Sequence, residues 1–326
     1  MLLLVLVLLT CSREKLVPSC PAEPLAVTPV SPPKPERMRE LGAFRLEGTW
    51  QLQSCDKRFG GYSSLLMLPG GTLLAITDRG STLRFSPPGI TPRSPPVFAR
   101  TIPWAVLTRT SVDSESATMD PASGSIWIGW ETTNAITRLD PGRALPRFAK
   151  PPAIAGWPEN RGAEAMVRLA DGRFIVLREG FGRPDDDGLL GERGHEALLF
   201  PRDPITGATP DRFRFVGPGG FSPVDMAQLP DGRVLILMRK LVWPLPIRLA
   251  GRIVIADPGD IRAGGDWPGT VVARLASDMP IDNFEGMAIV PGGGGRQTLW
   301  LISDANSAVT QRTLLWKLNV DPDALP

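Results

Sequence analysis

The chain has 326 residues, of which 42% are hydrophobic, and its 36 basic residues nearly balance its 34 acidic ones. This length and apolar content suffice for a large core, and a near-zero net charge without a dense Lys/Arg cluster argues against nucleic-acid binding. One histidine and three scattered cysteines exclude metal sites built from several His or Cys ligands. The sequence also lacks the Walker A motif and the glycine fingerprint of dinucleotide-binding proteins.

The chain begins with an apolar run, residues 2–9, followed by Cys11. The run is too short to span a bilayer, which needs about 20 apolar residues, but it suits a secretion signal. Residues 8–11 resemble a bacterial lipoprotein cleavage box, although Thr10 is unusual there and no Lys or Arg precedes the run. Residues 1–11 therefore predict export to the periplasm or cell envelope, with lipidation of Cys11 or, alternatively, simple cleavage of a soluble periplasmic protein.

Residues 12–40 are proline-rich, which predicts an extended, semi-rigid tether between the signal segment and a globular domain over 41–326. Cys20 lies in this tether and Cys55 opens the globular part. In an oxidising compartment the two could form a disulfide, and the alternative is a pair of free thiols.

The globular part contains a repeated pattern of two apolar runs joined by a turn, which predicts β-hairpins. Copies begin roughly 50 to 60 residues apart, a spacing typical of four-stranded propeller blades. No long amphipathic helix interrupts them, so the pattern predicts an all-β propeller. The five hairpins cover residues 63–78, 115–131, 164–179, 225–239 and 282–304.

The length of the globular part predicts six blades at about 40–50 residues per blade, and seven are also compatible. Residues 44–52 and 314–320 are both strand-like. We expect the N- and C-terminal strands to complete one blade together, because such closure removes exposed sheet edges. The tryptophans alternate within strands, which indicates packing between blades.

Carboxylates recur where these hairpins open. If the hairpins are the inner strands of successive blades, their open ends gather at one mouth of the central channel. Crowded carboxylates must protonate, pair with arginine or bind a cation, and oxygen ligands favour Ca²⁺, with Mg²⁺ as the alternative. Each acid could instead accept backbone hydrogen bonds in a turn. The acids concerned are Asp78, Asp113, Glu115, Glu131, Glu164, Glu179, Asp225, Glu285 and Asp304.

From this set we predict Glu164 and Glu285 as catalytic residues. The predicted metal ligands are Asp78, Glu115, Glu131, Glu179 and Asp304. Arginines are interleaved with the acids, and guanidinium groups suit an anionic, phosphate-bearing ligand. The predicted substrate-binding residues are Arg79, Arg161 and Arg178. A Ser-His-Asp triad could use only His195, which we expect to be a polar loop residue, and no Gly-x-Ser-x-Gly elbow supplies a serine.

The same segments resemble the phytase-like propeller family known as "esterase-like activity of phytase". The resemblance is carried by 113–116 with Glu131, 160–164 with Glu179, 282–286 with 303–306, and 311–315. It implies a propeller and the hydrolysis of esters or phosphoesters. Three segments depart from the family pattern. Ser114 and Ser116 replace Pro and Gly, Ala305 replaces a possible acidic ligand, and Arg239-Lys240 stands where an acid is expected.

Three functional hypotheses follow. The first is an exported, monomeric, cation-assisted hydrolase acting on an anionic small-molecule ester. The second is a non-catalytic envelope propeller that binds a ligand or protein. The third is a hydrolase similar to the sugar lactonases, which are also propellers with a central metal.

Overall fold

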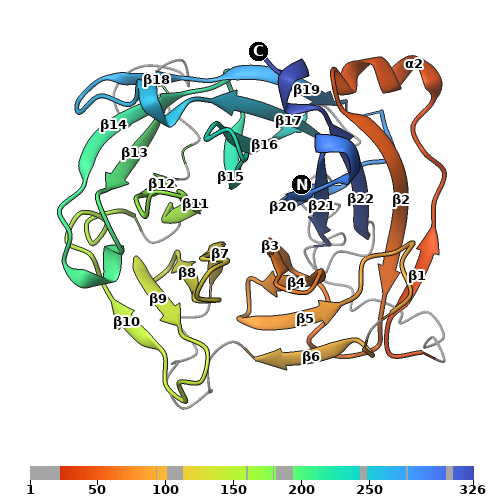
Figure 1. Cartoon of the computed structure of the whole chain (residues 1–326), viewed down its shortest axis with the longest axis horizontal. Coiled ribbons are helices and arrows are strands. Elements are labelled where there is room, and N and C mark those ends of the chain that lie inside the picture. The colour runs from red at the N-terminus through yellow and green to blue at the C-terminus, as the bar shows by residue number, and fades with distance from the viewer. Residues whose placement is uncertain are drawn as a thin grey trace, which may run out of the picture.

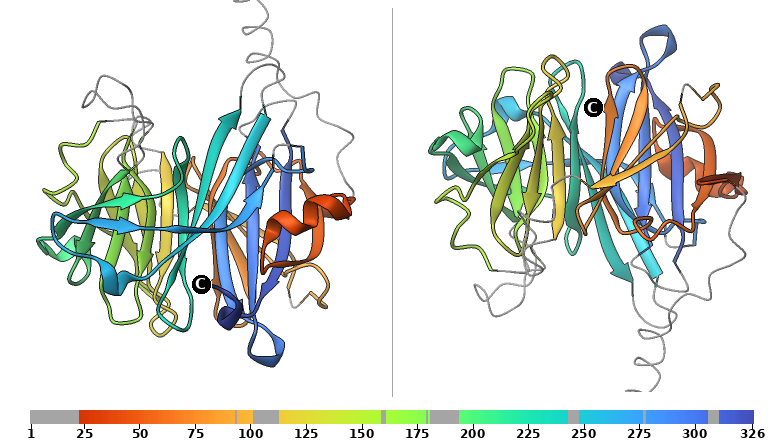
Figure 2. Two further views of the ribbon diagram at one scale, coloured as in Figure 1. Left: turned by 90° about the horizontal axis from the view of Figure 1, so that it is seen from above. Right: turned by 90° about the horizontal axis from the view of Figure 1, so that it is seen from below.

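Five β-sheets are arranged as blades around a central axis (Figure 1). The computed structural model describes residues 23–92, 94–100, 113–158, 161–178, 180, 194–242, 248–276, 278–305 and 311–326. The inner strands run along the axis, as the two side views show (Figure 2). Among the described residues, no helix has both the length and the apolar character needed to cross a bilayer.

Blades one to three follow the chain from the inside outward. Blade one consists of β3 (Tyr62–Leu68), β4 (Thr72–Thr77), β5 (Ser81–Phe85) and β6 (Val97–Arg100). Blade two consists of β7 (Ser114–Met119), β8 (Ile126–Trp130), β9 (Ala135–Leu139) and β10 (Arg147–Ala149). Blade three consists of β11 (Ala163–Arg168), β12 (Phe174–Arg178), β13 (His195–Phe200) and β14 (Asp211–Val216), to which β18 (Asp266–Pro268) adds in parallel.

Blade four consists of β15 (Ser222–Gln228), β16 (Val234–Val242), β17 (Arg248–Ala256) and β19 (Thr270–Leu275). Blade five consists of β20 (Asn283–Pro291), β21 (Gln297–Asp304), β22 (Thr313–Val320), β2 (Arg45–Gln53) and β1 (Ala26–Pro29). The N-terminal strand β2 therefore completes the blade of the C-terminal strand β22, as predicted.

The prediction of six blades is wrong: the propeller has five. The estimate divided the length of the domain by a standard blade, but blades three and five carry a fifth strand each. The inner strands β3, β7, β11, β15 and β20 contact one another in sequence, and β20 contacts β3, so no further blade stands between them.

Apolar side chains fill the five seams between neighbouring blades. Leu74 of blade one and Ile128 of blade two belong to one buried cluster, for example, and Leu237 of blade four and Leu301 of blade five belong to another. Strand side chains alternate between the two faces of a sheet, so each blade contributes to both adjacent seams. Trp127 and Trp300 are buried in these seams, as predicted.

The segment before residue 42 packs against the propeller over part of its length. β1 pairs with β2, and Leu25 and Leu41 are buried. Helix α2 (Pro35–Met38) and the 3₁₀ turn Arg39–Leu41 lie at the outer edge of the ring (Figure 1). Further 3₁₀ turns span Pro204–Thr206, Pro258–Asp260, Gly293–Gly295 and Pro322–Ala324.

Cys55 is disulfide-bonded. The other two cysteines, Cys11 and Cys20, lie outside the described residues, so lipidation of Cys11 and the pairing of Cys20 with Cys55 stay predictions.

Candidate functional site

A β-bulge interrupts every inner strand at the same place, near the N-terminal end of the strand. In each case the pairing with the second strand skips one residue. A bulge leaves one residue outside the regular ladder and redirects its side chain. The bulged residues in blades one to five are Ser63, Glu115, Glu164, Val224 and Glu285. Three blades thus present a glutamate from equivalent positions.

A second set of equivalent positions lies where the second strand of each blade reaches the same end. In blade one, for example, Tyr62 precedes the bulge and pairs with Thr77 of the second strand, and the residue that follows Thr77 is Asp78. In blades one to five these residues are Asp78, Glu131, Glu179, Arg239 and Asp304. Four are acids and blade four alone has a base; Glu179 lies outside the described residues.

Blade two gathers three carboxylates. Ligand oxygens of Asp113, Glu115 and Glu131 lie within 4.8 Å of one another. The backbone fixes the arrangement, since the Glu131 amide donates to the Asp113 carbonyl oxygen at 2.8 Å. The Gly162 amide donates to Oε1 of Glu131 at 3.4 Å. A Cβ on Gly162 would lie 2.7 Å from the Glu131 Cα, so only glycine permits this approach.

Glu115 connects this group to the other blades. Its pKa is raised well above the usual 4.5, first by burial and then by the charges of Glu164, Glu285 and Asp113. Carboxylates of blades two, three and five therefore act on one another at the centre of the ring.

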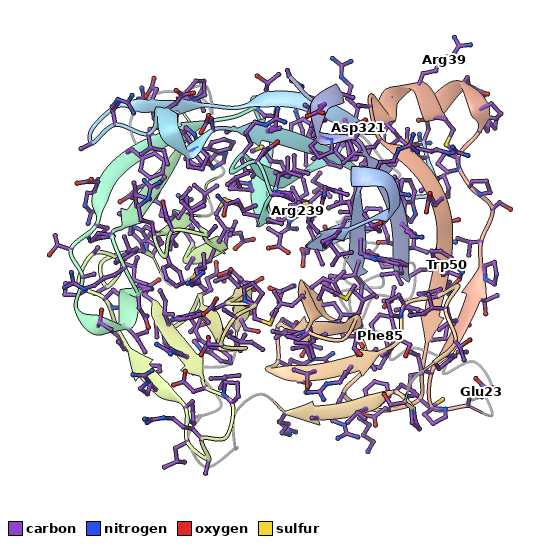
Figure 3. All side chains as sticks on the ribbon, in the orientation of Figure 1. Glu23, Arg39, Trp50, Phe85, Arg239 and Asp321 are labelled. Atoms are coloured by element: carbon purple, nitrogen blue, oxygen red, sulfur yellow. The ribbon has the colours of Figure 1, made fainter. Side chains whose placement is uncertain are left out.

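Arg239 lies between two of these acids. Its Nη2 is 3.6 Å from Oε1 of Glu164 and its Nη1 is 3.3 Å from Oε1 of Glu285. Asn283 donates from Nδ2 to Oε1 of Glu285 at 2.6 Å, and its Oδ1 accepts a hydrogen bond from Nη1 of Arg239 at 3.5 Å. Arg239 lies toward the centre of the ring in Figure 3, whereas Trp50 and Glu23 lie at its periphery. Blade four thus supplies a counter-ion to the acids of its two neighbours.

The three arginines predicted to bind substrate occupy different surroundings. Arg79 is half exposed, pairs with Asp78 through Nε at 3.3 Å and donates to the Gly60 carbonyl oxygen at 3.1 Å. Arg178 pairs with Glu196 at 2.9 Å on the neighbouring strand of blade three. Arg161 is half-buried just before β11, where its amide donates to the Pro158 carbonyl oxygen at 3.0 Å. Arg239, which the prediction did not assign, pairs with both Glu164 and Glu285.

Asp78 lies at the edge of the acidic group. Burial raises the pKa of its carboxyl, and the charge of Asp113 adds to the rise, while Arg79 opposes both. Asp304 is buried at the end of β21, opposite Asn283.

Asp225 accepts hydrogen bonds from the backbone, which was the alternative role considered for each acid. It follows the bulged Val224, and its two oxygens accept hydrogen bonds from the Met226 amide at 2.8 Å and the Met287 amide at 2.6 Å. The Leu65 amide also bonds to it. Asp225 therefore joins the inner strands of blades four, five and one.

The prediction that His195 is a loop residue is wrong. It begins β13, is buried, and its Nε2 lies 3.0 Å from the Phe221 carbonyl oxygen, so the ring donates from Nε2. Burial lowers the pKa of His195 to about 4. The ring is therefore neutral at pH 7.

The oxygen donors of blade two fit a hard divalent cation. Ca²⁺ takes ligand oxygens at about 2.3–2.6 Å, so two ligands of one ion lie up to about 5 Å apart. The 4.8 Å spread of Asp113, Glu115 and Glu131 falls within this limit. A cation here would also relieve the mutual repulsion that raises the pKa of Glu115.

Comparison with known proteins supports the fold and the family. A model of the family described as "Phytase-like: Esterase-like activity of phytase" matches residues 57–307. No curated protein sequence matches the chain. Among solved structures, the α-L-arabinofuranosidase of Podospora anserina superposes with a TM-score of 0.50 and 12% identity, covering 84% of this chain and 95% of the other. The PQQ-bound aldose sugar dehydrogenase of Streptomyces coelicolor gives a TM-score of 0.46 and 13% identity, covering 93% and 100%. At 12% identity, the match to the arabinofuranosidase supports the fold alone.

Proposed function

We propose, because the chain belongs to the phytase-like family described as "esterase-like activity of phytase", that it is a hydrolase of phosphoesters or related esters of an anionic small molecule. One observation carries the proposal. Carboxylates of three blades converge at the centre of the ring, where burial and then the charges of its neighbours raise the pKa of Glu115. Such perturbed groups are typical of functional sites.

Asp113, Glu115 and Glu131 are the residues that would hold a divalent cation, Ca²⁺ or Mg²⁺. When bound, such an ion polarises an ester oxygen and offsets developing negative charge. Asp78 and Asp304, and by sequence Glu179, lie at equivalent or adjacent positions and would complete the acidic surroundings.

Glu164 and Glu285 are the proposed catalytic carboxylates. Both are buried on bulges of inner strands and face Arg239. In the hydrolysis, a carboxylate of this pair accepts a proton from the attacking water, and the water oxygen bonds to the ester phosphorus or carbon. The bond from that atom to the ester oxygen then breaks, and the protonated carboxyl returns its proton to this oxygen, so that the product leaves as an alcohol. Arg239 orients the pair and presents its guanidinium to the anionic part of the substrate. Arg79, Arg161 and Arg178 stand farther out as candidates for secondary contacts.

The test combines cation binding with turnover. Ca²⁺ at a hundredfold excess over its dissociation constant should stabilise the fold by about 2.7 kcal/mol. Glu115→Gln preserves shape, removes one charge and should weaken that response, whereas Glu23→Gln at the exposed periphery should not. Hydrolysis of phosphomonoesters should require the same cation and fall with Glu164→Gln. A protein whose melting temperature ignores Ca²⁺ and whose Glu115→Gln variant is unaltered would contradict the proposal.

A non-catalytic binding propeller is the second candidate, and the Arg239 ion pairs favour it. An internal base already neutralises part of the charge that a crowded multi-cation site would need. Ca²⁺ binding without turnover on phosphomonoester, carboxylester and lactone panels would support this reading. Turnover of lactones alone would support the lactonase-like alternative.

We further propose that the protein is a monomer of the periplasm or cell envelope, anchored through Cys11. Cell fractionation of the full-length protein tests this. Cys11→Ser should move it from the membrane to the soluble fraction, and retention in the cytoplasm would contradict export.

A further inference from the structure

Three basic side chains share one face of blade four, away from the acidic centre. Arg252 on β17 lies directly opposite Arg274 on β19. Lys240 on β16 lies opposite Ala250, two residues from Arg252 on the same strand face. This face turns toward blade three, because its apolar members Met238 and Ala250 pack in the seam with Phe213 and Phe215. The register thus places three cations together.

We call Lys240, Arg252 and Arg274 the basic cluster. Two of its members, Lys240 and Arg252, lie over the ring of Phe221. Nζ of Lys240 lies 5.6 Å from the ring centroid and the guanidinium carbon of Arg252 lies 4.5 Å from it. Phe221 is buried, and its carbonyl oxygen accepts the bond from His195. Lys240 also rests against the backbone of Gly220, where a Cβ would approach Nζ to 2.9 Å. Two of the three cations are therefore positioned by packing.

No carboxylate among the described residues pairs with this cluster. Within the part of the chain that the structure describes, neither Lys240, Arg252 nor Arg274 forms an ion pair. Burial, followed by the charge of Arg274, lowers the pKa of Arg252. Glu40 opposes this shift only as a smaller effect, and Glu40 is already paired with Arg37.

Such an arrangement is unfavourable by itself. Like charges directly opposite on neighbouring strands destabilise a sheet, and a surface site for solubility alone would not need half-buried cations on one aromatic floor. An anion bound between them would remove the repulsion and make charge-assisted hydrogen bonds to the Arg252 fork and the Lys240 ammonium.

We propose that Lys240, Arg252 and Arg274 form a binding site for a tetrahedral oxyanion, of the phosphate class, at the seam between blades three and four. The site is separate from the central acids and does not depend on the proposed hydrolysis. Two sources supply this chemistry: a soluble phosphate ester or the headgroup of an anionic lipid.

Thermal melts in EDTA, with inorganic phosphate compared against sodium chloride of equal ionic strength, test the site. Phosphate should raise the melting temperature of the wild type above the chloride control. Calorimetric titration should show phosphate affinity falling about tenfold or more in Arg252→Gln, the cost of one lost charged hydrogen bond. Arg84→Gln, which removes one exposed cation from blade one, should retain the wild-type affinity.

A structural role for Arg252 predicts a different outcome. If the site is right, Arg252→Gln relieves the repulsion from Arg274 and keeps its melting temperature in chloride while losing the gain from phosphate. Arg274 is exposed, so Arg274→Gln provides a second variant that removes a charge of the site without removing a buried side chain. No phosphate gain in the wild type, or equal gains in all four proteins, would overturn the proposal.

Vesicles distinguish the two sources. Binding to phosphatidylcholine vesicles that contain phosphatidylglycerol, lost in Arg252→Gln, would assign the site to lipid headgroups. Phosphate binding without vesicle binding would assign it to soluble phosphate esters. Glu115→Gln should leave both readouts unchanged, so failure of the central site and failure of this one are separable.

Discussion

Arg239 shows how a single residue changes the charge balance of a repeated structure. Its equivalents in the other blades are acids, and its own blade has Val224 in place of a bulged glutamate. Compared with blades two and three, blade four therefore lacks two acids and gains one base at the centre of the ring. The result is an ion-paired side, formed by Arg239, Glu164 and Glu285, facing an acidic side formed by blade two.

We predict that Arg239→Gln destabilises the fold and increases its dependence on Ca²⁺. Removing one partner of a buried pair leaves uncompensated charge, which costs about 3 kcal/mol. Urea denaturation at pH 7.5 measures the loss, and Ca²⁺ should restore more stability to the variant than it adds to the wild type. Arg79→Gln is the matched control, because its exposed pair with Asp78 is worth less than about 1 kcal/mol. Equal losses in the two variants would count against a special role for Arg239.

Glu115 predicts a pH dependence whose sign follows from the direction of its pKa shift. A carboxyl with a higher pKa in the folded chain binds its proton more tightly there, so ionisation destabilises the fold as pH rises above the unfolded value of about 4.5. Glu115→Gln cannot ionise. In EDTA it should be more stable than the wild type at pH 8, with the difference shrinking toward pH 4.5. Unfolding free energies from urea titrations at both pH values check this, and a constant difference would contradict it.

At the scale of the element, the repeated bulge sets the direction of the side chains near the start of each inner strand. Each bulge shifts the pairing by one residue, and one residue decides which face of a strand a side chain occupies. The residue after the bulge then lies against the next inner strand. In β20 this residue is Gly286, whose Cβ would lie 2.8 Å from the Leu65 amide nitrogen of β3 and 2.6 Å from Cγ2 of Ile302.

Gly286→Ala should therefore separate β20 from β3 and destabilise the propeller by about 1–3 kcal/mol, the usual cost of overpacking. Gly293→Ala is the control, since a Cβ there meets no atom within 4 Å. Chemical denaturation of both variants gives the comparison. If the alanine at 286 were tolerated as well as the one at 293, the close approach of the two strands would not matter for stability.

For the whole molecule, closure of the ring depends on the N-terminal strand. β2 pairs with β22 on one side and β1 on the other, so it completes a blade whose inner strands come from the C-terminus. Without β2, the apolar face of blade five and the edge of β22 would be exposed.

We predict that a chain lacking residues 1–53 loses its single cooperative thermal transition, while a chain lacking residues 1–22 keeps it. Both should carry Cys55→Ser, so that no unpaired thiol remains. Circular dichroism melts and size-exclusion chromatography report the outcome. A cooperative, monodisperse 54–326 fragment would show that the ring holds without its closing strand.

Local pattern was enough to determine the hairpins and the fold class. Alternating apolar residues around Asp171-Gly172 and Asp231-Gly232 specify strands joined by tight turns, and both glycines adopt the positive φ that such turns require (90° and 99°). The strand-like character of both ends predicted the closing blade. Acidic residues recurring where hairpins open predicted an acidic mouth.

The tertiary structure decided how many blades close the ring and which side chains meet inside it. Blade number depends on how all the seams pack together, so two extra strands were enough to make a length estimate wrong. The placement of Asp225 on the backbone, and of Arg239 between Glu164 and Glu285, depends on a one-residue bulge and on contacts between blades far apart in sequence. A linear pattern carries neither, because a bulge changes the register without changing the apolar alternation on either side of it.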